Sequence, residues 1–128
     1  MDTELINRLA TASHAGTASF AEIMPALIAN NVESYRVDYR ERTITYYDIK
    51  SGTHTVTLAA PSVEIPDAFD AAQVTAAIRG AQRGEVRYPE FVSRTMAAGC
   101  VGYIAWLSGR QVTYFGRRGE THVEQFPR

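Results

Sequence analysis

Apolar and polar residues alternate strictly along the stretch from Glu33 to Arg40. Tyr35, Val37 and Tyr39 fall on one side of an extended chain, while charged and hydroxyl side chains fall on the other. A period of two residues predicts a β-strand with one buried face. Similar β-rich runs predict five further strands, at 43–49, 53–58, 99–107, 111–115 and 120–126. Short polar turns that contain glycine join several of them, so antiparallel hairpins are expected.

Helical periodicity precedes each group of three strands. Apolar residues recur three and four positions apart in four segments, near 5–10, 20–28, 69–78 and 91–96. Ser19 and Glu22 form a capping-box pattern at the start of the second segment. Pro25 lies inside that segment, which predicts either a bend or a helix that effectively starts there. Pro89 suits the first turn of the fourth helix.

A shift of the chain by 68 positions aligns the two groups of elements without a gap. Ten of the sixty aligned positions are identical. Identical strand residues are Tyr35 and Tyr103, Arg42 and Arg110, Thr45 and Thr113, Tyr46 and Tyr114, Thr53 and Thr121, and His54 and His122. Because one register aligns helix, loop and strand positions together, the sequence predicts two copies of one unit.

The predicted fold class is α+β, with two tandem ααβββ units related by internal duplication. The units span 1–60 and 67–128, and a linker at 61–66 contains two prolines. The antiparallel strands are expected to form one sheet or two abutting sheets packed against the helices. The first strand of the second unit is apolar on both faces, which predicts a central strand or one covered on both sides. A chain of 128 residues is expected to be a single domain.

Composition limits the classes of protein to which the chain can belong. A net charge of −1 with 45% hydrophobic residues indicates a globular chain and argues against a polyanion-binding surface over the whole molecule. The single cysteine, Cys100, excludes an intramolecular disulfide and favours a reducing compartment. No signal-peptide pattern and no apolar run of about 18 residues occurs. The expected location is the cytoplasm, with no membrane partner.

Two histidines at equivalent positions of the two units are candidate catalytic or metal-binding residues. Each follows a threonine at the start of the third strand of its unit. His54 and His122 would face each other across a pseudo-twofold axis or lie on opposite edges, and the sequence leaves both arrangements open. Glu124 shares a strand face with His122, so these three residues could form a metal or proton-transfer site. Val56 stands where the second unit has Glu124, which leaves few ligands for a metal. The alternative is a structural histidine bonded to a neighbour, and neither a metal nor another cofactor is predicted.

Two equivalent arginines, each at the start of a second strand, are candidates for ligand binding. Arg42 and Arg110 lie three residues ahead of Thr45 and Thr113, which are followed by Tyr46 and Tyr114. A guanidinium beside tyrosine hydroxyls can hold a carboxylate or a phosphate. The alternative is an arginine that flanks a turn and stacks on an aromatic ring or pairs with a nearby carboxylate.

Two further features favour structural roles. Arg117 and Arg118 with nearby aromatic residues could contact a nucleic acid, but the near-zero net charge favours a solvated hairpin tip. Cys100 follows a predicted helix end, where the helix dipole disfavours a thiolate, so a buried filler is expected rather than a nucleophile. Sequence signatures of serine hydrolases, phosphate loops, dinucleotide-binding folds and zinc proteases are absent from the chain.

Several stretches resemble the YbcV-like family of small bacterial and prophage-associated proteins. They are Gln82-Arg83-Gly84-Glu85, Tyr88-Pro89-x-Phe91, Ala97-Ala98-Gly99-Cys100-Val101-Gly102-Tyr103 and Tyr114-Phe115-Gly116-Arg117-x-Gly119-Glu120-x-His122-Val123-Glu124. The resemblance covers nearly the whole chain, because Ala10-Thr11-Ala12-Ser13-His14-x-Gly16 and Tyr35-x-Val37-Asp38 also fit the family. It implies a domain of unknown function, whose members are sometimes labelled phage envelope proteins, and it transfers no activity.

Taken together, the sequence predicts a prophage-type binding or regulatory module without enzymatic activity. Its partner would be a host protein or a small anionic ligand. The predicted contact residues are Arg42, Arg110, Tyr46, Tyr114, His54, His122 and Glu124. The alternative is a small hydrolase or metal-dependent enzyme that uses His54 and His122, with Cys100 as a further candidate. Exposed edge strands, expected at 35–39 or 121–126, also predict self-association into a homodimer.

Overall fold

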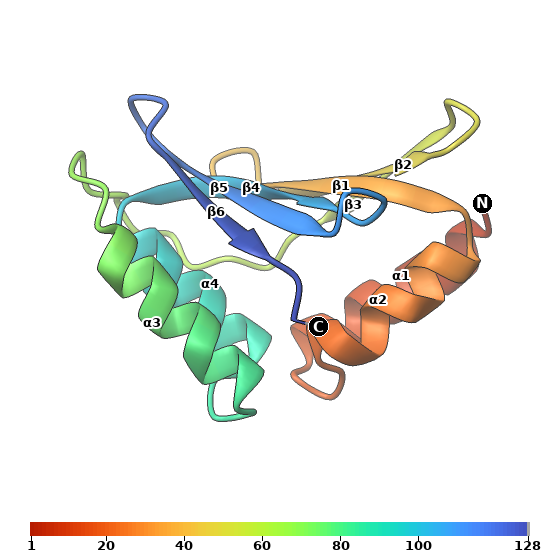
Figure 1. The fold of residues 1–128 in the computed structure, drawn as a ribbon, viewed down its shortest axis with the longest axis horizontal. Helices are drawn as coiled ribbons and strands as arrows, with labels where there is room; N and C mark the ends of the chain where they lie inside the picture. Colours follow the sequence, from red (N-terminus) through yellow and green to blue (C-terminus); the bar gives the residue numbers. More distant parts are fainter. Residues whose placement is uncertain (128) are drawn as a thin grey trace.

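Four helices and six strands make up the chain in a computed structural model that describes residues 1–127 (Figure 1). In chain order they are α1 (Thr3–His14), α2 (Phe20–Ala29), β1 (Val32–Asp38), β2 (Thr43–Asp48), β3 (Thr53–Thr57), α3 (Ala71–Gln82), α4 (Tyr88–Ala97), β4 (Cys100–Trp106), β5 (Gln111–Gly116) and β6 (Thr121–Gln125). The α+β class and the antiparallel strands predicted from the sequence are confirmed.

All six strands belong to one antiparallel sheet with the order β3-β2-β1-β4-β5-β6. The two halves of the chain therefore meet at β1 and β4, and β3 and β6 form the two outer edges. The prediction of an edge strand at 35–39 is wrong, because that stretch lies in central β1, whereas the strand predicted at 121–126 is at an edge. In the β1–β4 pairing, Arg36 lies opposite Ile104. These two positions are themselves 68 residues apart, so a pseudo-twofold axis passes between them.

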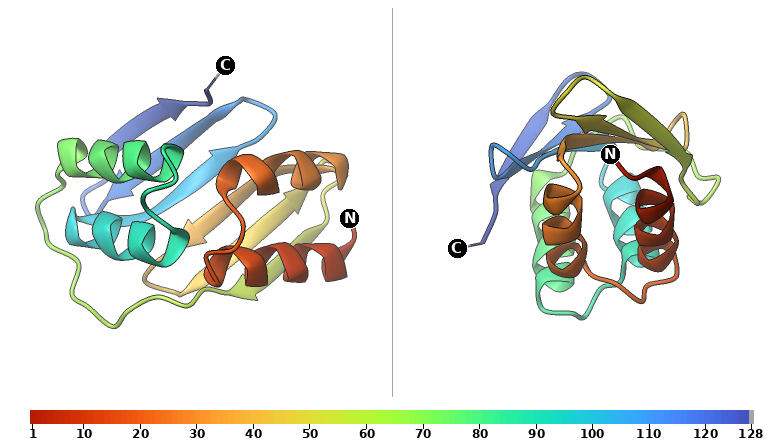
Figure 2. Two further views of the ribbon diagram at one scale, coloured as in Figure 1. Left: turned by 90° about the horizontal axis from the view of Figure 1, so that it is seen from below. Right: turned by 90° about the vertical axis from the view of Figure 1, so that its right-hand side faces the viewer.

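All four helices cover the same face of the sheet and leave the other face open (Figures 1 and 2). The α1–α2 pair lies under the strands of the first half, and the α3–α4 pair lies under those of the second. The hairpin tips at 49–52 and 117–119 rise at opposite ends of the open face in Figure 1. We call this open side the uncovered face.

Every helix and strand of the first half has its counterpart 68 residues later, with the same length. The capping aspartates follow the same rule, because Asp2 accepts backbone hydrogen bonds at the start of α1 and Asp70 does so at the start of α3. Left-handed backbone also recurs at this spacing. The pairs are Gly16 and Gly84, Asn31 and Gly99, Arg42 and Arg110, and Ser51 and Gly119.

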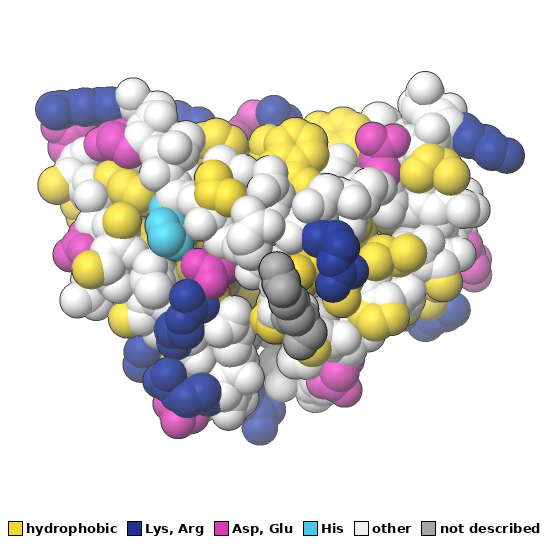
Figure 3. All heavy atoms as spheres, in the orientation of Figure 1, with side chains coloured by type: hydrophobic (Ala, Val, Ile, Leu, Met, Phe, Trp, Pro, Cys, Tyr) yellow, Lys and Arg dark blue, Asp and Glu magenta, His cyan; other side chains and the backbone are white. Residues whose placement is uncertain are grey.

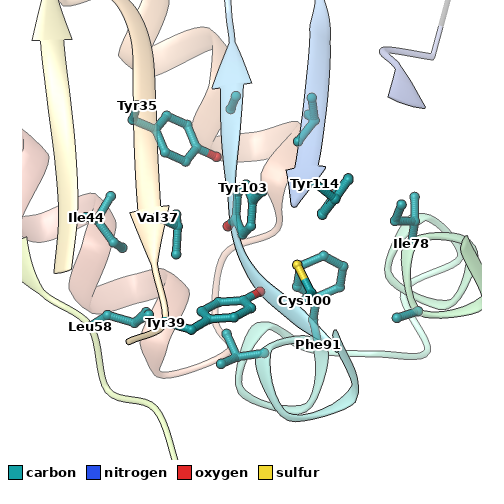
Figure 4. Close-up of a cluster of buried hydrophobic side chains, with 14 of the residues drawn as sticks. Tyr35, Val37, Tyr39, Ile44, Leu58, Ile78, Phe91, Cys100, Tyr103 and Tyr114 are labelled. Atoms are coloured by element: carbon teal, nitrogen blue, oxygen red, sulfur yellow. The ribbon is translucent and has the colours of Figure 1, made fainter. Parts of the chain in front are cut away.

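The core lies between the sheet and the helices and is rich in tyrosine (Figure 4). Tyr46, Tyr35, Tyr103 and Tyr114 form a row across the four inner strands. The ring centroids are 5.4 Å apart for Tyr35 and Tyr46, and 5.3 Å apart for the equivalent pair Tyr103 and Tyr114. Such tilted aromatic pairs add stabilisation beyond the burial of their area.

Two local predictions left alternatives open, and the structure rules out one alternative of each. The second helix begins at Phe20 and continues through Pro25, so it does not start at the proline. The predicted capping box of Ser19 and Glu22 is present, and Pro25 is exposed, so water can satisfy the carbonyl that loses its donor. The first strand of the second half, β4, is central as expected, but Trp106 on its uncovered face is 39% exposed. That strand is therefore covered on one side only.

Candidate functional site

The two equivalent histidines lie on opposite edges of the sheet. His54 is in β3 and His122 is in β6, with four strands between them. The structure therefore does not bring them into one shared site, and the pseudo-twofold axis separates them. Each contacts the helix of its own half, since Nε2 of His54 lies 2.8 Å from Oδ1 of Asn7 in α1. Thr75, the equivalent of Asn7 in α3, lies beside His122 in the same way.

The second half adds charged groups around His122 that the first half lacks. Nε2 of His122 lies 3.2 Å from Oε2 of Glu124 and 3.4 Å from Oγ1 of Thr75. Arg79 donates from Nη1 to the other carboxylate oxygen of Glu124 at 2.5 Å. The carboxylate of Glu124 is thus shared between an arginine and a histidine.

This cluster lacks the geometry of a catalytic triad. In a triad the carboxylate holds one ring nitrogen and the nucleophile meets the other, whereas Glu124 and Thr75 both meet Nε2 of His122. The Thr75 hydroxyl donates its proton to the carbonyl of Ala71 at 2.9 Å, so that proton is not available to the histidine. Among residues 1–127, no group of three histidine, cysteine or acidic side chains is placed to hold a metal ion.

Arg42 is engaged with the linker. Its Nη1 donates to the carbonyl of Ala60 at 2.8 Å, and its Nη2 donates to the carbonyl of Pro61 at 3.3 Å and to the hydroxyl of Ser62 at 2.8 Å. These bonds fix the chain where it leaves the first half. Three hydrogen bonds thus join the guanidinium to acceptors of its own protein.

Arg110 has a different neighbour at the equivalent position. Its Cζ lies 5.7 Å from the ring centroid of Phe126, which is a cation–π arrangement. The structure thus matches the alternative of an arginine stacked on an aromatic ring. Phe126 also packs edge-on against Phe20 at 5.3 Å, so this contact ties the end of the chain to α2.

The tyrosines predicted to accompany the arginines lie in the core. Tyr46 and Tyr114 are both 5% exposed and face the helices, away from the uncovered face. Burial raises the pKa of both phenols, so both remain protonated. The predicted fork of arginine and tyrosine hydroxyls is not assembled in either half.

Cys100 is fully buried and unreactive in its surroundings. Burial is the main cause that raises the pKa of its thiol to about 11, and Sγ donates to the carbonyl of Gly102 at 3.1 Å. A thiolate is required for nucleophilic attack, and at neutral pH this thiol stays protonated. Its position fits the filler role expected from the sequence.

A hollow of about 440 Å³ opens on the uncovered face at the junction of the two halves. We call it the Arg36 hollow. Its lining comprises Ser34 and Arg36 of β1, Tyr47 of β2, Ile104 and Trp106 of β4, together with Glu33, Asp48, Ile49, Ser51 and Gly52. Figure 3 shows hydrophobic side chains along the upper side of the molecule, where the uncovered face is seen edge-on.

Strand register explains how the Arg36 hollow forms. Ser34 lies directly opposite Tyr47 on one side and Trp106 on the other, so a small side chain separates two aromatic ones. Arg36 is the next outward-facing residue along β1, and the diagonal neighbours of such a residue lie at about 7–8 Å. Both aromatic residues are diagonal to Arg36. A shift in register between Val32 and Ser34 accompanies this arrangement.

Charges in the Arg36 hollow are unevenly compensated. The carboxylate of Asp48 pairs with the terminal ammonium of Met1 at 3.2 Å and accepts from the amide of Lys50 at 2.7 Å. The amide hydrogen bond is the main cause that lowers the pKa of Asp48. By contrast, Arg36 and Glu33 form no ion pair with any residue of the described chain. One cation and one carboxylate thus remain for an external partner.

Sequence reasoning did not identify these residues as a site. The alternating pattern places Arg36 on the exposed side of one strand, and Trp106 belongs to a strand that is apolar on both faces, so neither pattern indicates a binding site. Knowledge that β1 pairs with β4 is needed to bring the two together. The available signal was the combination of a single tryptophan and an outward arginine at nearly equivalent positions of the two repeats.

Comparison with known proteins places the chain in a family. The sequence model of a family described as "Protein of unknown function (DUF1398)" matches residues 10–125. The chain belongs to this family. Relatives with similar sequence are the uncharacterized proteins Mb2035 of Mycobacterium bovis and Rv2012 of Mycobacterium tuberculosis, each 35% identical over 63 residues. The match covers 49% of this chain and 38% of each mycobacterial protein, so the aligned part is well under half of those relatives.

No helix in the described residues of this DUF1398 protein has both the length and the apolar character needed to span a membrane. The family description and the names of the relatives state no activity, ligand or partner.

Proposed function

We propose that the protein is a binding module without enzymatic activity, and that a small anionic ligand binds at the Arg36 hollow. The observation that carries the proposal is the exposed guanidinium of Arg36, unpaired within residues 1–127, in a hollow of about 440 Å³. Known ligand pockets of proteins have volumes of about 300–1,000 Å³. Arginine is also the side chain best suited to carboxylates and phosphates.

The lining supports binding more than catalysis. Tyr47, Ile104 and Trp106 provide apolar contact, and the hydroxyl of Ser34 adds a polar group. Histidine and cysteine are absent from the lining, so the usual nucleophile and base pairs are missing there. The predicted contacts at Arg42, Arg110, Tyr46, Tyr114, His54, His122 and Glu124 stay predictions. All of these residues except Tyr46 and Tyr114 are exposed or half-buried.

We also propose that the two halves arose by internal duplication, and that the protein acts in a reducing compartment such as the cytoplasm. The constant spacing of 68 residues between equivalent elements supports the first proposal. The lone buried Cys100 supports the second. Resemblance to prophage-associated proteins makes a host molecule the proposed source of the ligand, and β3 and β6 remain candidate edges for a homodimer.

Thermal unfolding in the presence of small carboxylic acids, sugar phosphates, nucleotides and metal ions tests the proposal. A ligand at a hundred times its dissociation constant adds about 2.7 kcal/mol to the free energy of unfolding. We expect an anion to raise the unfolding temperature of the wild type but not of Arg36→Gln.

Arg40→Gln is the matched control, because Arg40 is an exposed arginine near the end of the same strand and its loss changes the net charge equally. A stabilising anion whose effect persists in Arg36→Gln would contradict the assignment of the site. The absence of any stabilising ligand would favour a protein partner instead.

A further inference from the structure

The apolar part of the Arg36 hollow limits the kind of anion that it suits. Tyr47 and Trp106 stand on either side of Ser34, and Ile104 lies between Trp106 and the axis. Trp106 is held in place by a hydrogen bond from Nε1 to Oγ1 of Thr113 at 3.1 Å, yet 39% of the residue stays exposed. An aromatic ring that is both fixed and exposed is available for stacking.

Arg36 is close enough to both rings for one small molecule to contact all three. It is the diagonal neighbour of Tyr47 and of Trp106, and diagonal neighbours in an antiparallel sheet are about 7–8 Å apart, with their Cβ atoms somewhat closer. Its guanidinium stacks on neither ring, since the cation–π contact found in residues 1–127 involves Arg110 and Phe126. The arginine fork is thus free to meet an anionic group while a ring lies against the aromatic side chains.

The two carboxylates in the lining of the Arg36 hollow determine whether a ligand with one or with several negative charges is favoured. Asp48 is neutralised by the terminal ammonium, but Glu33 is an uncompensated carboxylate in the lining. Like charges brought together without compensation are unfavourable. A ligand with a single carboxylate meets Arg36 and avoids Glu33, whereas a polyanion meets both.

We infer that the Arg36 hollow takes a planar aromatic monocarboxylate. The carboxylate accepts hydrogen bonds from Arg36, and the ring packs against Trp106 and Tyr47. This inference rests on the proposed function, because it specifies the class of anion that the same hollow binds.

Trp106 is the single tryptophan of the chain, so its fluorescence reports on the hollow directly. Four compounds separate the features of the ligand: benzoate, cyclohexanecarboxylate with the charge but no planar ring, benzamide with the ring but no charge, and benzene-1,3,5-tricarboxylate with extra charges. We expect benzoate to change the emission saturably and to bind about three- to tenfold more tightly than cyclohexanecarboxylate. Benzamide and the tricarboxylate are expected to bind more weakly than benzoate.

Substitutions test which side chains bind benzoate. Arg36→Gln is expected to weaken benzoate binding by about tenfold or more, while Arg40→Gln leaves it unchanged. Tyr47→Leu removes one ring and keeps Trp106 as the reporter, so it should weaken benzoate binding and reduce its advantage over cyclohexanecarboxylate. Amide chemical shifts of Ser34 and Arg36, followed by NMR in the same titrations, give a second readout that does not depend on the tryptophan.

Each contrary result has a distinct meaning. Equal affinity for benzoate and cyclohexanecarboxylate, with both lost in Arg36→Gln, would overturn the aromatic class but keep an anion site at the Arg36 hollow. Tighter binding of the tricarboxylate would overturn the preference for a single charge. No binding of any carboxylate would overturn the inference, and the proposed function would then stand only if another anion of the thermal unfolding panel stabilised the wild type but not Arg36→Gln. Equal weakening of benzoate binding by Arg36→Gln and Arg40→Gln would overturn both the inference and the proposed function.

Discussion

Gly99 and Asn31 occupy equivalent positions with left-handed backbone, but they differ in what surrounds them. The φ angles are 89° at Gly99 and 64° at Asn31. A Cβ atom on Gly99 would overlap the carbonyl oxygen of Ala68 and would lie 3.0 Å from Cα of Phe69. These are backbone atoms, so they cannot rotate away. The amide of Asp70 donates to the carbonyl of Ala98 at 2.8 Å, which further fixes the linker against this turn.

The expected cost of Gly99→Ala has two parts. Left-handed backbone costs a residue with a Cβ about 1–2 kcal/mol, and forcing extra atoms into a packed site costs about 1–3 kcal/mol. Together they amount to about 2–5 kcal/mol of the free energy of unfolding. Asn31 is exposed, so Asn31→Ala creates no overlap and removes only the better fit of asparagine to left-handed backbone. The free energy of unfolding should fall by at most about 1 kcal/mol.

Urea denaturation measures the difference, with Trp106 fluorescence and far-ultraviolet circular dichroism as two probes. We expect the loss in Gly99→Ala to exceed that in Asn31→Ala by at least about 1 kcal/mol, and Asn31→Gly to stay within about 0.5 kcal/mol of the wild type. Equal losses in the two alanine variants would show that backbone conformation alone sets the cost. That result would refute the role assigned to the contact with Ala68.

Three further predictions concern side chains in the core and at the turns. Burial lowers the pKa of His14 below its ordinary value of 6.5, so on acidification the unfolded state binds a proton before the folded state does. The free energy of unfolding should therefore decrease as the pH drops below about 6.5. Urea titrations at several pH values should show a smaller decrease in His14→Phe than in the wild type. Arg42→Met should cost about 2 kcal/mol because it removes charged hydrogen bonds to the linker, whereas Arg110→Met should cost about 0.5–1 kcal/mol; equal unfolding free energies in the two variants would contradict this. Cys100, with its thiol pKa raised to about 11, should resist a thiol-specific reagent at neutral pH until urea unfolds the chain, and rapid modification of the native protein would contradict its burial.

Local patterns in the sequence predicted the elements because each pattern depends on residues close together in the chain. The alternation of Tyr35, Val37 and Tyr39 marks the covered side of β1, and all three are buried. Ser19 and Glu22 form the predicted capping box because both partners belong to the same helical turn.

Contacts between the halves could not be predicted in the same way. Whether His54 and His122 converge depends on which strands join the two halves, and that choice is made by packing between residues about 70 positions apart. The Arg36 hollow has the same origin, since Ser34 and Trp106 become neighbours only after β1 pairs with β4. The role of Arg42 likewise depends on the path of the linker, which has no periodic pattern to read.

Arg36 lies beside the pseudo-twofold axis, and this position bears on whether the centre of the sheet can carry a positive charge. In a dimer of two identical halves, the residues on the axis would be the same, and an arginine there would face a second arginine directly across the strand pair. Like charges at such a short cross-strand distance destabilise a sheet. A single chain removes this constraint, because Arg36 can face Ile104 while the backbone pairing stays symmetric. Joining the halves into one chain therefore permits an isolated positive charge at the centre of the sheet, which a symmetric assembly of identical halves would disfavour.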